Sequence, residues 1–563
     1  MRLLPGCFAI AVITAGLPVG AQETVEGPSK ASLPPQPLEP WTDPDPGTPK
    51  KRYNIFSDIG VRGGAEYRAQ LLYVNPISLN TVTDRRISSI DHRLRLDLGV
   101  DYKDMVRLNV SMDALSGVLW GDNGDLDKEP RPAFGTNVNT RNVNSARTCV
   151  AYREGDPLTA GAYGYALCPA NDVFVRRAYG EVLTPIGLFR VGRQAYTEGM
   201  GTAVADGEGR TNRFGVNGIG NNVDGVMFAT KPLEALVPQD KRDSSDSRGL
   251  FLIVRYDRLV TDQLRFFADD LHNIVDGFRF LMPDYSLGHN LELRLLHNFR
   301  WDDRNATGVH AVNVRAASAF GRFSAGIDAT IIAGKTREVS SAYHVINNDP
   351  IVDQDVLQFG ARAVVRYDTE VVTGYLEFDY ASGDADPQTR SPLTQFVFAE
   401  DANVGLLLFD QVLSFQTARA AAAGVELLTR LGAPSQPADS VFTRGAFSNA
   451  VAIFPQVDVR PHPTVLLRGG VLVAWAAEKA IDPVASLRAK DGSNMEDDLV
   501  NFAGGKPGTF YGVELDGRAQ WKFLNHFALD LEGAVLFPGD ALYDRNGDAV
   551  HSFLVQGRTT FFF

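Results

Sequence analysis

The chain has 563 residues, of which 44% are hydrophobic, 22% charged and 10% aromatic. This composition is too apolar for a disordered chain. The net charge of −13 and the lack of a Lys/Arg block argue against a nucleic-acid partner. No mature segment approaches the ~18 consecutive apolar residues of a membrane-spanning helix, which excludes a helical membrane protein. A large β protein or several soluble domains remain.

The N-terminal segment reads as a targeting signal. Met1 and Arg2 precede an apolar stretch, and Val19-Gly20-Ala21 offers small residues at a cleavage site. This pattern predicts a secretory signal peptide over residues 1–21. Residues 22–54 are dense in proline, which is typical of an extended linker, here in the periplasm. Residues 55–563 are predicted to form one domain.

Two cysteines remain in the mature chain, Cys149 and Cys168, within one Gly/Asn-rich stretch. In an oxidising compartment this pair predicts a disulfide. The alternative is two free thiols.

From residue 55 onward, apolar and charged residues alternate along the chain. In one segment Leu94, Leu96 and Leu98 oppose Arg93, Arg95 and Asp97. Successive side chains of a strand point to opposite faces, so this pattern predicts strands with one apolar and one charged face. The alternation recurs to the C-terminus, and in the segment 509–523 it places Glu514 and Asp516 on the charged face.

A soluble sandwich also alternates, but three features favour a membrane barrel. The strands run to about ten residues or more, the ~9–11 residues needed to cross a bilayer at a tilt. Aromatic residues such as Trp301, Tyr367 and Trp521 sit near strand ends, as an interfacial girdle requires. The terminal Phe561-Phe562-Phe563 resembles the assembly signal of outer-membrane barrels.

The connections alternate in length along the chain. Short joins such as Gly321-Arg322 alternate with long ones such as Gly383–Gly445. Short periplasmic turns and long extracellular loops are typical of bacterial outer-membrane barrels. We therefore predict an all-β, transmembrane antiparallel barrel of about eighteen strands, with sixteen as the alternative, in the outer membrane. The join Lys231–Arg248 is long for a periplasmic turn, and it could contain a further hairpin.

The charged face must be internal, because Arg or Lys at the lipid midplane costs ~2–4 kcal/mol. The predicted pore-lining residues share this inward register and are Arg62, Arg68, Arg93, Arg95, Arg107, Arg294, Arg362, Arg366, Arg468, Arg518, Glu514 and Asp516. We expect Arg93, Arg95, Arg107 and Arg362 among the side chains that line the passage. One interpretation is a charged passage for anionic or polyhydroxylated solutes. The other is a salt-bridged interior that fills the barrel and blocks flow.

One connection differs from the others. Asn403–Thr429 is apolar and Ala-rich, with no period of two, and it is therefore helix-like. It could fold into the lumen as a constriction, or it could cover the mouth as an extracellular cap.

Several short motifs resemble known barrels. The segments Arg176–Val182 and Gly187–Gln194 resemble a hairpin of bacterial porins and alginate-export barrels. Together with Tyr380–Pro387, Gly512–Asp516 and Phe537–Asp540, they resemble the alginate-export family and, more closely, a related group of uncharacterised outer-membrane proteins. The resemblance implies an eighteen-strand barrel that passes a sugar polymer or small solutes. In that family an Arg-lined constriction handles a polyuronate, whereas acidic inward residues are about as frequent here.

Motifs of catalysis or metal binding were not found. No HExxH or CxxC spacing occurs, no Ser/His/acid set can be read, and we expect neither an enzyme nor a cofactor. The oxygen-rich turns Gly121–Asp127 and Asp544–Asp548 could take Ca²⁺, although neither keeps a full calcium-loop spacing.

The leading hypothesis is a porin-like channel for polar or anionic solutes, with saccharides as candidate solutes. The alternatives are an export barrel for an anionic polysaccharide and a closed barrel for surface adhesion or scaffolding. Outer-membrane lipids, small polar solutes or a polysaccharide are the expected partners, and a homo-oligomer is possible.

Overall fold

The computed structural model describes residues 52–56, 58–80, 86–103, 105–121, 138–141, 149–152, 173–195, 199–204, 212–216, 220–243, 245, 247–261, 271–303, 305–400, 402–432, 438–496, 499–501, 504–523 and 526–563. The chain divides into two units, Met1–Pro37 and Leu38–Phe563, and every described residue belongs to the second. The expected signal peptide and most of the expected linker lie outside the described residues.

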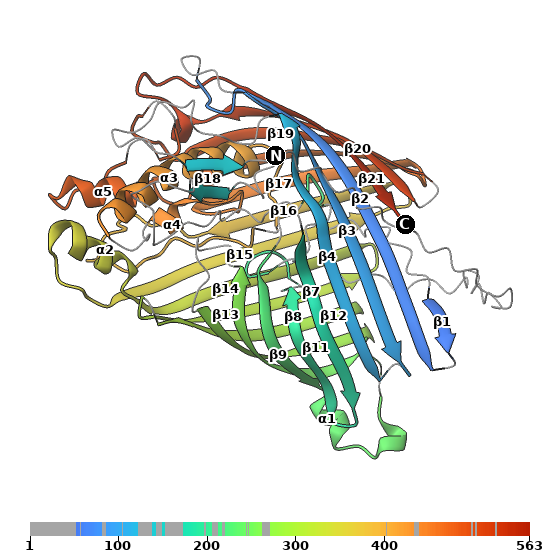
Figure 1. The fold of residues 1–563 in the computed structure, drawn as a ribbon. Helices are drawn as coiled ribbons and strands as arrows, with labels where there is room; N and C mark the ends of the chain where they lie inside the picture. Colours follow the sequence, from blue (N-terminus) through green and yellow to red (C-terminus); the bar gives the residue numbers. More distant parts are fainter. Residues whose placement is uncertain are drawn as a thin grey trace, which may run out of the picture. The chain divides into compact units, whose positions relative to one another are not determined.

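The second unit is a closed antiparallel barrel of 18 strands. Each strand pairs with the preceding and following barrel strands, and β21 closes the ring by pairing with β2 (Figure 1). The strands are β2 (Ile59–Asn75), β3 (Ile87–Tyr102), β4 (Val106–Gly121), β7 (Phe174–Thr184), β8 (Gly187–Ala195), β9 (Asn222–Thr230), β10 (Gly249–Thr261), β11 (Leu271–Tyr285), β12 (Gly288–Asp302), β13 (Thr307–Phe320), β14 (Phe323–Thr336), β15 (Gln354–Asp368), β16 (Val372–Ala381), β17 (Ala450–His462), β18 (Val465–Ala476), β19 (Phe510–Phe523), β20 (Phe527–Pro538) and β21 (Ser552–Phe562). The predicted fold class and the count of eighteen strands are confirmed.

The two faces of the strands are placed as the alternation predicts. On β3, Leu98 is 50% exposed, whereas Arg93 on the opposite face is 1% exposed. On β19, Leu515 and Trp521 are exposed, whereas Glu514 is buried. A protein whose exposed strand face is apolar and whose enclosed face is ionic is the inverse of a soluble sandwich, and it fits a lipid environment.

The connections also follow the predicted two-sided pattern. The joins 286–287, 321–322 and 463–464 are two residues long and lie at one end of the strands, whereas 382–449 and 477–509 lie at the other end. The join between β9 and β10 contains α1 (Pro232–Ala235) and the short helix η3 (Gln239–Lys241). Within its described residues it therefore holds no hairpin.

Outward aromatic residues mark both ends of the strands. Trp301 and Trp475 lie at the strand end that carries the long connections, whereas Tyr367 and Trp521 lie at the end with the short turns. Such girdles sit at the two membrane interfaces of outer-membrane barrels.

The remaining elements lie in the connections, except for β1 (Arg52–Phe56), which lies beside the start of β2. β1 pairs with β2 and begins within the range that the sequence assigns to the linker, and β5 (Val138–Arg141) pairs with β6 (Cys149–Tyr152). The helices are α2 (Glu338–Asn347), η4 (Leu408–Leu413), α3 (Ser414–Arg430), α4 (Ala438–Val441), α5 (Pro483–Ala489) and η5 (Asp540–Leu542).

Among the residues that the structure describes, no helix combines the length and apolarity needed to span a membrane.

Candidate functional site: the barrel interior

The residues predicted to line the pore lie on the inner face of the barrel. Three of them are half-buried: Arg62, Arg107 and Arg366. The others are buried: Arg68, Arg93, Arg95, Arg294, Arg362, Arg468, Arg518, Glu514 and Asp516. Most of the predicted side chains are therefore surrounded by protein and have little contact with solvent.

Burial of these arginines is matched by carboxylates on adjacent strands. Arg362 Nε on β15 lies 2.6 Å from Asp379 Oδ1 on β16. Arg468 donates from Nε and Nη2 to both oxygens of Asp458, at 2.7 and 2.8 Å. A guanidinium fork fits a carboxylate in this way and holds both groups in place.

The same pattern continues across β18–β21. Arg518 Nη2 lies 2.7 Å from Asp530 Oδ1, and Arg558 lies 3.3 Å from Asp530 and 3.2 Å from Glu532. Charges buried at this depth are tolerated only when they are paired. These side chains therefore form a cross-linked lining.

A second set of pairs joins β2, β3, β4 and β7. Arg95 and Arg176 both contact Asp113, each at 2.8 Å, and Arg93 pairs with Glu66. Arg93 and Arg95, which we expected among the lining residues, thus belong to this set, whereas Arg362 belongs to the other. Arg107, also expected there, lies next to the short turn that follows β3.

Part of the β8–β9 connection folds into the barrel, which the sequence did not predict. Met200 O accepts from Arg362 Nη1 at 2.9 Å, and Met200 N donates to Asp328 Oδ2 at 3.0 Å. Because Arg362 and Asp328 point inward from β15 and β14, residues 199–204 lie against the inner wall. The alternation of connection lengths instead predicts an extracellular loop for this segment.

Residues 212–216 of the same connection are held by the next strands of the inner wall, β17–β20. Arg468 and Arg518 both donate to Arg213 O, at 2.5 and 3.0 Å, so the structure brings these two predicted residues together. The Arg213 side chain donates to Gln456 Oε1 at 2.6 Å, and its guanidinium lies 3.4 Å from the centroid of the Tyr375 ring. The available sequence signal was an arginine in a Gly-rich stretch, and such a stretch has no periodicity that would place the side chain.

The apolar connection after β16 is also anchored inside the barrel. The backbone N–H groups of Leu406, Leu407 and Leu408 donate to the Glu514 carboxylate at 2.7, 2.8 and 2.6 Å. Gly405 precedes them with φ +73°, and a Cβ there would lie 2.8 Å from Glu514 Oε1. Only glycine combines this backbone conformation with so close an approach.

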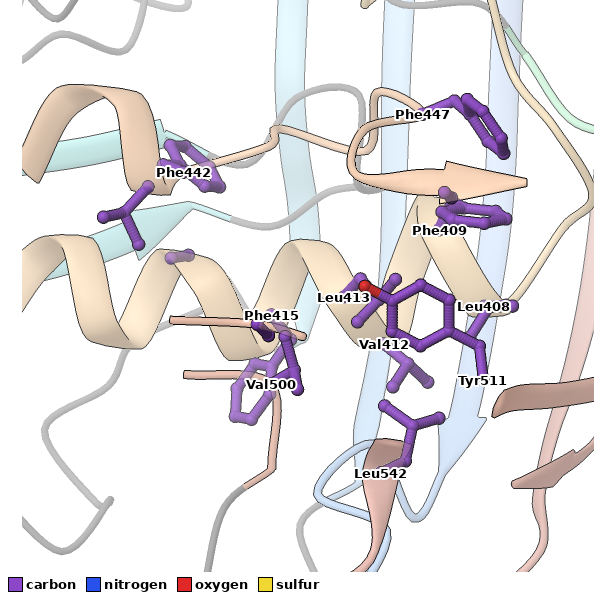
Figure 2. Packing of buried hydrophobic residues seen from close by; sticks show 14 of the residues in the cluster. Leu408, Phe409, Val412, Leu413, Phe415, Phe442, Phe447, Val500, Tyr511 and Leu542 are labelled. Carbon is purple, nitrogen blue, oxygen red and sulfur yellow. The ribbon is translucent and has the colours of Figure 1, made fainter. Parts of the chain in front are cut away.

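The rest of this connection forms an apolar cluster at the long-loop end of the strands. Figure 2 shows Leu408, Val412 and Tyr511 close together, with Phe409 beside Phe447. Phe415 packs in the same cluster with Val500 and residues of α4 and α5. The start of Asn403–Thr429 therefore enters the barrel, and α3 packs in the apolar cluster at the long-loop end of the strands.

The inner face of β8–β12 is less uniformly buried, and we call it the accessible wall: Arg255, Asp257 and Arg294 are buried there, whereas other inward side chains keep exposed surface. Its side chains Met227, Ile253 and Leu296 are half-buried. Arg190 pairs with Glu181 at 2.6 Å with its side chain 27% exposed, and Arg279 pairs with Glu292 at 3.0 Å with its side chain 22% exposed. We call the inner face of β13–β21 with β2 and β3 the packed wall. Arg190 and Arg279 were not among the predicted residues, although both have the inward register.

No cofactor site emerges from the described chain. Among the described residues, no group of three or more His, Cys, Asp or Glu side chains is arranged to hold a metal ion. In the turn Asp544–Asp548, the Asp544 carboxylate accepts backbone N–H groups of Asn546 and Asp548. The turn Gly121–Asp127 lies almost entirely outside the described residues, as does Cys168, so the predicted disulfide with Cys149 stays a prediction.

Comparison with known proteins gives structural likenesses alone. No family model matches the sequence, and no curated protein matches it. Among solved structures, Acinetobacter baumannii OccAB1 is similar with a TM-score of 0.48 and 11% identity, over 89% of this chain and 96% of that chain. Pseudomonas aeruginosa OccK2 (OpdF) is similar with a TM-score of 0.45 and 9% identity, over 89% and 97%. A BenF-like porin from Pseudomonas fluorescens Pf-5 gives 0.45 and 9%, over 89% and 98%.

The assignment of the barrel rests on its own geometry. Every barrel strand has two hydrogen-bonded neighbours, the exposed face is apolar, and aromatic girdles border it. Closed barrels satisfy every backbone group without water, which is the condition for spanning a membrane with strands. The described chain is a transmembrane β-barrel of the bacterial outer-membrane type.

Proposed function

We propose that this protein is a porin-like channel for small polar or anionic solutes, and that the solute follows the accessible wall. The observation that carries the proposal is the contrast inside the barrel. Arg362, Arg468 and Arg518 of the packed wall are buried in ion pairs, whereas Arg190 and Arg279 of the accessible wall keep exposed surface. Barrels of 16–18 strands are wide enough to enclose an aqueous passage unless loops fill it.

The composition of the accessible wall fits a solute with both charge and apolar surface. Arg190, Arg279 and Arg300 alternate there with half-buried apolar side chains such as Met227 and Leu296. A guanidinium that keeps exposed surface can contact a passing anion while it stays paired with its carboxylate. Rings and rows of Arg are a known means of favouring anions in pores.

Conductance of the refolded protein in a planar bilayer tests this proposal. We expect discrete open steps, with a reversal potential in a salt gradient that favours anions. A barrel that shows the heat-modifiable migration of a folded outer-membrane protein but conducts no current would contradict the channel.

The polysaccharide-export alternative rests on the motif resemblance to the alginate-export family. It predicts that a strain lacking the protein fails to secrete an anionic polymer while its small-solute uptake is unchanged. Normal secretion by that strain would remove this alternative.

The closed-barrel alternative is favoured by a different observation. Residues 199–204, 212–216 and 402–413 all occupy the interior and contact inward side chains. If they seal the passage, no current flows, and the protein serves surface adhesion or scaffolding through its long connections. The same bilayer recording therefore separates the two functions.

A further inference from the structure

The outward surface of the barrel carries one concentration of ionisable side chains. Most outward ionisable residues of the described strands lie on six consecutive strands, β8–β13: Arg193, Asp224, Arg258, His272, Asp276, His297 and His310. The first four are cross-strand neighbours near the long connections, where lipid headgroups begin. The last three lie further along their strands, and we call them the belt triad.

The belt triad lies within the apolar belt rather than above it. On β11, Asp276 stands between the outward neighbours Ile274 and Phe278, which are both exposed. On β12, His297 stands between Leu295 and Phe299. Apolar residues on both sides along the strand place these polar groups at the depth of acyl chains.

The three side chains form a hydrogen-bonded chain across three adjacent strands. His297 Nδ1 lies 2.9 Å from Asp276 Oδ1, and His297 Nε2 lies 3.0 Å from His310 Nδ1. The His310 ring also stacks on Phe299 with centroids 4.6 Å apart. Within the described residues, no hydrogen bond reaches Asp276 Oδ2 or His310 Nε2. The chain therefore has a carboxylate at one end and an imidazole nitrogen at the other, both facing outward.

Acyl chains cannot satisfy either end. A polar group in hydrocarbon without a partner costs several kcal/mol, so such groups in membrane proteins normally face protein or water. Phosphate headgroups lie nearer the strand ends, at the level of Arg193 and Arg258. A protein surface with a donor and an acceptor at matching positions is the partner that the belt triad fits.

We propose that the belt triad is the centre of a two-fold interface between two copies of this chain in the membrane. Asp276, His297 and His310 follow one another on β11, β12 and β13, so His297 is central. A two-fold axis along the membrane normal, lying between the two copies and in front of His297, reverses left and right. It brings Asp276 of each copy opposite His310 of the other, which gives two identical contacts between a carboxylate and an imidazole. Such self-complementarity is the requirement for an isologous dimer.

The first experiment measures the mass of the protein in lipid nanodiscs by native mass spectrometry. We expect two copies for the wild type and one copy for the triple variant Asp276→Leu, His297→Leu, His310→Leu. The matched control is His92→Leu, because His92 points outward from β3, far from the patch in strand order. This control should stay dimeric. A monomeric or trimeric wild type, or a triple variant that stays dimeric, would overturn the proposal.

The second experiment identifies the neighbour directly. A photo-crosslinking residue at Val312, which is paired with His297 in the β12–β13 register, is compared with one at Leu515 on the opposite part of the barrel. We expect a product of twice the chain mass from the first position and none from the second. A product with lipid or with another protein would overturn the two-copy interface. Unchanged single-barrel conductance of the triple variant would show that the channel proposal is independent of this interface.

Discussion

The packed wall and the accessible wall are built from the same alternating strands, yet they have opposite interiors. On the packed wall, Arg362, Arg468 and Arg518 are buried, and each is matched by a carboxylate. On the accessible wall, the side chains of Arg190 and Arg279 remain partly exposed. The difference lies in what covers each wall: the inserted segments 199–204, 212–216 and 402–413 lie against the packed wall.

Arginine therefore has two different uses inside the barrel. A buried arginine that holds a backbone carbonyl, as Arg468 holds Arg213 O, fixes an inserted segment. An arginine with exposed surface is available to a solute. Substitutions on the packed wall should therefore change stability and pore size, whereas those on the accessible wall should change selectivity.

The largest effect is expected from Glu514→Ala. Three buried backbone N–H groups would lose their acceptor, and each unsatisfied group costs about 1–3 kcal/mol. We expect a lower midpoint of urea unfolding in vesicles and a larger single-channel conductance, since residues 406–408 are released. Glu514→Gln keeps one acceptor oxygen, so its unfolding midpoint and its conductance should lie between those of Glu514→Ala and those of the wild type. A variant with wild-type midpoint and conductance would show that Glu514 does not anchor the segment.

A comparable loss of stability is expected from Arg362→Leu. It leaves Asp379 and Glu377 buried without their main cation, and breaking a buried pair in this way costs about 3–5 kcal/mol. The double variant Arg362→Leu, Asp379→Leu should recover part of the loss, because it removes both charges. Equal unfolding midpoints for the single and double variants would argue against a coupled pair.

A smaller effect is expected from Gly405→Ala. The positive φ strains any Cβ by about 1–3 kcal/mol, and the new methyl would also meet Glu514 Oε1. Gly432→Ala is the matched control, because its φ is +71° but a Cβ there would have no atom within 4 Å. The difference between the two unfolding midpoints isolates the close approach at Gly405. If both variants lose the same stability, the close approach of the new methyl to Glu514 Oε1 and Leu472 Cδ2 contributes nothing.

The smallest change in stability is expected from Arg279→Gln on the accessible wall. Glu292 keeps a second cation, because Arg315 Nη2 lies 3.4 Å from its Oε2, so the unfolding midpoint should fall less than in Arg362→Leu. The reversal potential in a salt gradient should shift towards cations, because one accessible positive charge is lost. Arg258→Gln on the outer surface removes the same charge outside the barrel and serves as the control. The proposed path of the solute fails if both variants have wild-type selectivity.

The sequence determined the barrel and the faces of its strands. A period of two repeated over about ten residues can bury only one face, and the cost of charge in lipid decides which face that is. The predicted residues Arg68, Arg95 and Asp516 are therefore enclosed, as the register required. Arg279 was not among the predicted residues because β11 departs from the alternation of apolar and charged residues: Val275 faces inward and Asp276 faces outward.

Only the tertiary structure decided which inward charges meet a solute. The exposure of the Arg362 and Arg190 side chains depends on whether a segment distant in the sequence, or a residue of another strand, lies against them. No local periodicity encodes such a contact. Residues 212–216 reach Arg468 and Arg518 across more than two hundred positions. Alternation is a property of neighbours along one strand, whereas the filling of the lumen is a property of contacts between distant connections, and it therefore required the folded chain.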